Sequence, residues 1–107
     1  MNIDMSNKRL SVAPMIDWTT TDYRYFARIF NPHVYLYTEM ISTGALLYGN
    51  RERHLRFAKE EHPLVLQLGG ADTKEMSQCA QLAQQYGYDE VNINVGCPSD
   101  RVQHNKI

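Results

Sequence analysis

The sequence has no long hydrophobic run and very little cysteine. No apolar stretch approaches the ~18–20 residues that a membrane span needs, and the opening MNIDMSNKRL is too polar for a secretory signal. We therefore expect no membrane partner. The two cysteines, Cys79 and Cys97, form neither a CxxC pair nor a disulfide framework. These features predict a cytoplasmic protein with reduced thiols.

An excess of charge of either sign is also missing. Eleven Lys and Arg residues against twelve Asp and Glu residues give a formal net charge of -1. This balance excludes a strongly basic nucleic-acid-binding domain, but not an RNA-acting enzyme whose binding surface lies in another part of a longer chain. The four histidines are too scattered to suggest a metal site: His33, His54, His62 and His104. We expect no metal.

What the sequence does contain is an alternation of short apolar runs and helical patterns. Strands are expected over residues 9–15, 33–40, 63–70 and 89–96, and helices over residues 20–30, 51–61 and 72–86, with a loop and one helical turn over 42–50. This order predicts parallel strands joined by helical crossovers. A doubly wound sheet and a (β/α)8 barrel both fit, but no GxGxxG follows the first strand.

A complete barrel needs about 250 residues, and this chain has 107. We therefore predict an α/β fold that is the N-terminal half of a TIM (β/α)8 barrel, with about three βα units plus the fourth strand. Residues 1–107 are then the N-terminal part of one catalytic domain.

Several local features have ordinary structural explanations. The charges of residues 51–61 are expected to form a solvated helix face. Cys79 lies in an apolar helical stripe and is expected to be a small core residue. Asp72 and Gly87 are placed to begin and end the helix between them. Thr19–Thr21 supply cap candidates for the first helix, which Asn31 should end, because a proline follows it.

Polar residues stand where each predicted strand ends, and these ends form the active site in (β/α)8 barrels. Gln67 interrupts an apolar strand, and a buried amide without partners costs ~1–3 kcal/mol. A ligand with adjacent donors and acceptors, such as the pyrimidine edge of a flavin, would satisfy it. Glu39 fits a rim ion pair and a functional role equally well. Asn92 and Asn94 share a strand face, and Cys97 follows between glycine and proline. Its neutral thiol can serve as an acid.

These motifs carry a resemblance to a known family. SVAPMIDWT, LYTEM followed by TGA, LQLGG and GYDEVNINVGCPSDRVQ resemble tRNA-dihydrouridine synthases, most closely the bacterial A-type enzymes. The resemblance implies a flavin-binding barrel followed by a helical tRNA-binding domain, which lies beyond residue 107. It also implies reduction of uridine in tRNA to 5,6-dihydrouridine, with FMN as cofactor, NADPH as reductant and tRNA as partner.

The resemblance also implies roles for individual residues. Pro14, Met15 and Ile16 match the segment that lies against the flavin ring, and Gln67 matches a glutamine that hydrogen-bonds it. Cys97 matches the general acid that protonates the uracil.

Two further residues are expected to meet the substrate. Asn94 matches an asparagine that contacts the flavin and the uridine. Arg101, just past the fourth strand, would contact phosphate or RNA, and a salt bridge with Asp100 or Glu90 is an equal alternative.

Two other functions remain open from the residues. Another FMN-barrel oxidoreductase would act on a small-molecule pyrimidine, and a truncated barrel module would be inactive. Four strands cannot close a barrel, so we expect little or no synthase activity from residues 1–107 alone.

Overall fold

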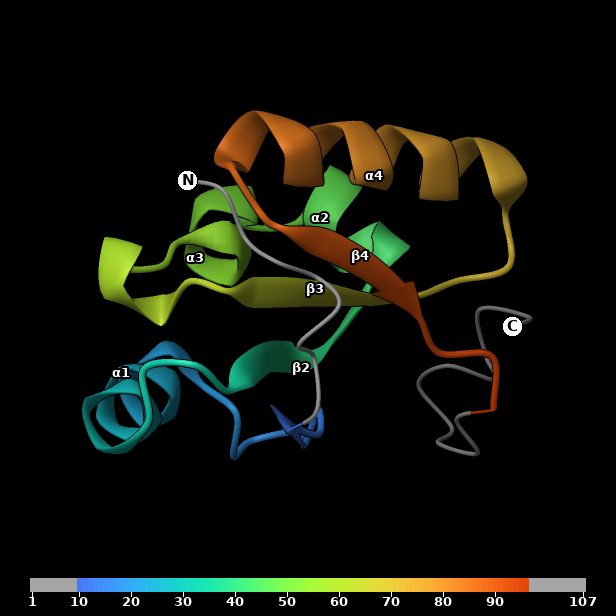
Figure 1. The fold of residues 1–107 in the computed structure, drawn as a ribbon. Coiled ribbons are helices and arrows are strands. Elements are labelled where there is room, and N and C mark those ends of the chain that lie inside the picture. Colours follow the sequence, from blue (N-terminus) through green and yellow to red (C-terminus); the bar gives the residue numbers. More distant parts are fainter. Residues whose placement is uncertain (1–9, 97–107) are drawn as a thin grey trace.

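The sheet has parallel strands that lie in the same order as in the sequence (Figure 1). The computed structural model describes residues 10–96. The strands in this range are β1 (Ser11–Val12), β2 (Tyr35–Ser42), β3 (Leu64–Gly69) and β4 (Glu90–Ile93). The helices are α1 (Thr21–Phe30), α2 (Thr43–Tyr48), α3 (Arg51–Leu55) and α4 (Thr73–Tyr86), with a 3-10 turn η2 (Lys59–Glu61) before β3. The predicted α/β class with parallel strands is confirmed.

Strand β3 lies in the middle of the core. All its residues are buried, which explains why its sequence is almost continuously apolar. Leu66 and Leu68 pack toward Cys79 and Ala83 of α4, together with side chains from α2 and α3. Figure 1 shows these three helices on one side of the sheet. Cys79 is fully buried, so its expected place in the core is confirmed.

The helix ends follow the expected capping rules. Asp72 accepts a hydrogen bond of 2.9 Å from the Glu75 N–H and begins α4. Gly87 ends that helix at φ 90°, a left-handed conformation that glycine adopts without steric cost. Thr20 caps α1 through the Tyr23 N–H, and Asn31 is its last cap residue. These predictions are confirmed.

Several predicted boundaries differ from the observed ones. Strand β1 is two residues long, shorter than 9–15, because the Met15 carbonyl already accepts hydrogen bonds from a turn at Trp18 and Thr19. Strand β2 begins and ends two residues later than expected, and β4 ends at Ile93. Within 42–50, a helix (α2) takes the place of the expected loop with one turn.

The predicted helix over residues 51–61 is wrong in its second half. Helix α3 ends at Leu55, and Arg56 is extended. Phe57 packs edge-on against the rings of His62 and Tyr88. Glu61 is fully buried, so the expected solvated face does not include it. These tertiary contacts override the helical preference of the local sequence.

Helix α1 buries two arginines instead of its phenylalanines. Phe26 and Phe30 are 59% and 73% exposed. The buried positions are Arg24 and Arg28. Arg28 donates to backbone carbonyls, including those of Val34 at 2.6 Å and Glu61 at 2.9 Å. Burial lowers the pKa of Arg28, and the carboxylates of Glu61 and Asp89 act in the opposite direction.

Candidate functional site at the carboxyl ends of the strands

Three carboxamides meet on one face of β3 and β4. Gln67 and Asn92 are register partners, and the Gln67 Nε2 donates to Asn92 Oδ1 at 2.7 Å. Asn94 Nδ2 lies 3.5 Å from Gln67 Oε1. We call these three residues the amide cluster. The cluster confirms that Asn92 and Asn94 point to the same face, and it presents both N–H donors and C=O acceptors.

The burial of Gln67 does not by itself require a ligand. Its side chain is buried, but Asn92 and Asn94 provide its amide with hydrogen-bond partners. The desolvation cost that we expected a ligand to offset is therefore offset within the protein. The place of Gln67 near the end of β3 and the family resemblance of its motif support a role toward a cofactor.

An irregularity in β2 joins the amide cluster to the neighbouring strand. The register of β2 and β3 shifts between Tyr37 and Met40. In this bulge the Thr38 hydroxyl accepts a hydrogen bond of 3.1 Å from the Gln67 N–H and donates to the Glu39 carbonyl at 2.7 Å. Bulges often re-aim side chains near sites. The sequence does not indicate this bulge, so it did not predict the hydrogen bonds of Thr38.

The segment after β1 forms a tight turn, Met15–Thr19. The Thr19 hydroxyl accepts from the Met15 N–H and donates to the Met15 carbonyl, both at 3.1 Å. Asp17 has a φ of 69°, and its N–H donates to Glu39 Oε1 at 2.5 Å. Glu39 therefore holds this turn against the end of β2. The sequence left two explanations of Glu39 open, an ion pair at the rim and a functional role. The contact that the structure shows is a hydrogen bond with the backbone of Asp17.

The turn presents apolar side chains to the outside. Met15 and Ile16 are 42% and 39% exposed, and Pro14 is half-buried. The turn connects through Glu39 and Thr38 to Gln67. Hydrogen bonds thus connect the turn that contains Met15 and Ile16 with Gln67 and Asn94, and Pro14 directly precedes that turn.

Two predicted residues, Cys97 and Arg101, lie outside the described residues. The last described position is Gly96, whose N–H donates to Asn94 Oδ1 at 3.0 Å. Asn94 itself is tied to the sheet by its N–H, which donates to the Leu68 carbonyl at 2.9 Å. The backbone leading to Cys97 is therefore anchored to the amide cluster.

A cleft of about 500 Å³ lies beside the turn. Its lining includes the acidic residues Asp17 and Glu39 and the basic or imidazole side chains of Arg53, His54 and Arg56. The amide cluster does not line it; of the predicted cofactor residues, only Ile16 does.

No metal or membrane feature accompanies these residues. Within residues 10–96, no group of three His, Cys, Asp or Glu side chains could hold a metal ion. No helix in that range is long and apolar enough to cross a bilayer.

Comparison with known proteins adds the family. A model of the dihydrouridine synthase family matches residues 11–107. A tRNA-dihydrouridine(20/20a) synthase of Pseudomonas aeruginosa is 60% identical over 101 residues, which are 94% of this chain and 30% of that protein. The corresponding protein of Shewanella oneidensis is 56% identical over 101 residues, again 94% of this chain and 30% of its own.

The chain therefore spans about 30% of the length of the curated relatives it matches. The match includes every strand end described above and nearly the whole sequence. The resemblance read from the motifs is confirmed: this chain belongs to the dihydrouridine synthase family.

Proposed function

We propose that this chain is the N-terminal half of a flavin-binding (β/α)8 barrel that reduces uridine in tRNA to 5,6-dihydrouridine. One observation carries the proposal. The amide cluster lies at the carboxyl ends of adjacent parallel strands in a chain 60% identical to a tRNA-dihydrouridine synthase. Successive strands that pair in chain order also favour a barrel over a doubly wound sheet, in which the strand order reverses.

The residues present fit FMN. The amide cluster offers donors and acceptors side by side, as the pyrimidine part of a flavin does. Met15 and Ile16 offer half-exposed apolar side chains, which suit a flat aromatic ring system. Gln67 would hold the ring edge, and Pro14, Met15 and Ile16 would lie against it.

The reduction adds one hydride and one proton to the C5=C6 bond of uracil. FMN, when bound and reduced by NADPH, supplies the hydride that C6 accepts. Cys97 supplies the proton that C5 accepts, and its thiolate regains a proton from water. Asn94 would orient the base beside the cofactor, and Arg101 would contact the RNA backbone.

The tRNA must present its uridine outside the base stack, as base-modifying enzymes require. A net charge of -1 gives residues 1–107 little attraction for a polyanion. We therefore assign most tRNA binding to a helical domain outside this chain. The proposed substrate places the reaction in the cytoplasm, and residues 1–107 alone should have little or no synthase activity.

A chimera tests this function. In the Pseudomonas aeruginosa relative, the matched 101-residue segment is replaced by this chain; we call the product the chimeric synthase. We expect it to bind FMN and to restore dihydrouridine, measured by mass spectrometry of tRNA, in a strain that lacks its synthases. The unaltered relative is the positive control. A folded, flavin-loaded chimera that forms no dihydrouridine would contradict the proposal.

A further inference from the structure

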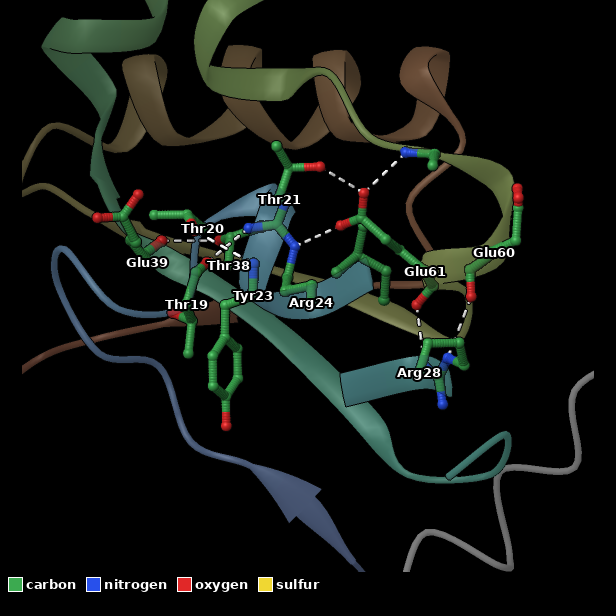
Figure 2. A network of polar contacts seen from close by, with 12 residues as sticks. Thr19, Thr20, Thr21, Tyr23, Arg24, Arg28, Thr38, Glu39, Glu60 and Glu61 are labelled. Atoms are coloured by element: carbon green, nitrogen blue, oxygen red, sulfur yellow. Dashed lines mark hydrogen bonds and ion pairs between the residues drawn. The ribbon is translucent and has the colours of Figure 1, made fainter. Parts of the chain in front are cut away.

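A buried ion pair joins helix α1 to the turn before β3. Arg24 Nε lies 2.5 Å from Glu61 Oε1, and their side chains are 5% and 0% exposed. Figure 2 shows the pair between the two segments. A buried ion pair seldom adds stability compared with apolar residues of the same volume, because both charges lose their hydration. The pair is therefore better explained by the segments that its side chains hold in position than by a gain in stability.

Glu61 is fixed by more than its arginine. Its Oε2 accepts from the Thr21 hydroxyl at 2.6 Å and from the Ala58 N–H at 2.7 Å. Both oxygens of the carboxylate are therefore in use, and Arg24 is held in one orientation. Two or more hydrogen bonds to a buried carboxylate make it a rigid anchor.

Arg24 extends this anchor to the turn after β1. Its Nη1 donates to the Thr19 carbonyl at 2.6 Å, as Figure 2 shows. Thr19 is fully buried, and its hydroxyl binds both the N–H and the carbonyl of Met15. An unbroken series of hydrogen bonds thus runs from Glu61 through Arg24 and Thr19 to Met15.

We infer that Arg24 is a positioning residue for cofactor binding: through Glu61 and Thr19 it sets the backbone of the turn that presents Met15 and Ile16. The side-chain hydrogen bonds of Arg24 go to Glu61 and Thr19, not to the amide cluster. Arg24 therefore acts on the cofactor through the turn. This inference rests on the proposed function, in which that turn lies against the flavin ring. It adds a residue that the sequence motifs did not indicate.

Helix α1 provides a matched comparison. Arg28, one helical turn further along, is also buried, and it donates to the carbonyls of Asn31, Val34, Glu60, Glu61 and Pro63. None of these carbonyls belongs to the Met15–Thr19 turn. Arg28 binds the backbone of Glu61 but not its carboxylate. Loss of Arg28 should therefore lower stability, while the contacts of Arg24 with the Glu61 carboxylate and with the turn remain.

The first test needs no cofactor. Amide hydrogen exchange is measured on this chain and on its Arg24→Met/Glu61→Leu double variant, which avoids leaving one buried charge unpaired. We expect the turn amides to exchange at least about tenfold faster in the double variant, while β3 and α4 keep their protection. Equal protection of the turn in both proteins, or no protection in the parent, would overturn the inference.

The second test measures FMN affinity in the chimeric synthase. We expect the double variant to bind FMN roughly 10-fold more weakly. In metal sites, removing a residue that hydrogen-bonds a ligand of the metal has an effect of this size. The single variant Arg24→Lys should lose less FMN affinity than the double variant, and Arg28→Met should keep the affinity of the parent. Parent-like affinity in the folded double variant would contradict the inference. A chimera without FMN binding would contradict the proposed function, while the exchange result still decides the role of Arg24.

Discussion

Gln67 and Asn92 stand opposite each other in the parallel register of β3 and β4, and their side-chain amides are joined by a hydrogen bond of 2.7 Å. Each strand thus contributes one carboxamide to the same face at the same level. Because the partner amide holds it, the Gln67 side chain has a defined orientation before any ligand arrives. Pre-orientation of this kind lowers the entropy cost of binding.

The second glycine of the LQLGG segment, Gly70, is required by close packing against Thr43. A Cβ at Gly70 would lie 2.7 Å from Thr43 Oγ1 and 2.8 Å from its Cγ2. We expect Gly70→Ala to lower the free energy of unfolding by about 1–3 kcal/mol, measured by urea denaturation. The loss should shrink in a Thr43→Ala background. Gly44→Ala is the control, because nothing lies within 4 Å of that site. Additive effects of Gly70→Ala and Thr43→Ala would contradict the proposed clash.

Tyr88 should make the protein sensitive to high pH. Burial raises the pKa of Tyr88 above the ordinary value of 10.0, and its hydroxyl donates to the Leu55 carbonyl at 2.8 Å. The folded state then holds this proton more tightly than the unfolded state. The stabilisation is complete below pH 10 and falls as the pH rises further, by about 1.4 kcal/mol per pH unit.

Tyr88→Phe tests this pH dependence. The variant should lose about 1 kcal/mol at neutral pH, the usual net value of one hydrogen bond, and should show a shallower decline of stability above pH 10. Urea denaturation at a series of pH values measures both. Tyr25→Phe, at a ring that is 45% exposed, is the control. An equal alkaline decline in parent and Tyr88→Phe would show that Tyr88 is not the group responsible.

The sequence allowed prediction of the local features but not of the tertiary ones. The cap at Asp72 and the left-handed Gly87 depend on neighbouring residues, and both were predictable. The burial of Glu61 was not predictable, because it depends on Arg24, which lies 37 residues away in the chain. Charges in a run are usually solvated, so the ion pair leaves no signal in either segment alone.

The proximity of the three carboxamides was predictable from the order of the strands. Parallel strands bring their carboxyl ends to one edge, so Gln67 and Asn94 were expected near each other from topology alone. Asn92 shares the face of Asn94 by the two-residue period, and this alternation was the signal for its place in the cluster. Thr38 enters only through a bulge, which the sequence did not indicate.

Gln67→Ala should weaken retention of FMN in the chimeric synthase. The substitution removes the amide that we assign to the ring edge and leaves Asn92 without its 2.7 Å partner. We expect a loss of roughly 10-fold in affinity, about 1.4 kcal/mol, measured by flavin fluorescence titration. Gln84→Ala, at an exposed position of α4, should leave affinity unchanged. A Gln67→Ala protein that keeps its full flavin content and affinity would remove Gln67 from the cofactor site.

Cys97→Ala should separate cofactor binding from uridine reduction in the chimeric synthase. The variant keeps every residue assigned to FMN, so we expect parent-like flavin content. It lacks the thiol that we propose as the proton donor for C5, and general acids typically contribute 10²–10⁴-fold to a rate. We therefore expect reduced flavin to be reoxidised by tRNA at least about 100-fold more slowly, measured anaerobically by absorbance.

Cys79→Ala is the matched control for this experiment. Cys79 is fully buried among the side chains of the core between the sheet and α4, and burial is the main cause that raises the pKa of its thiol. Its loss should lower thermal stability but leave the reoxidation rate of the folded protein near that of the parent. Wild-type rates with Cys97→Ala would show that another group delivers the proton. Slow rates with both variants would point to general destabilisation, and only a loss specific to Cys97 supports its role as the acid.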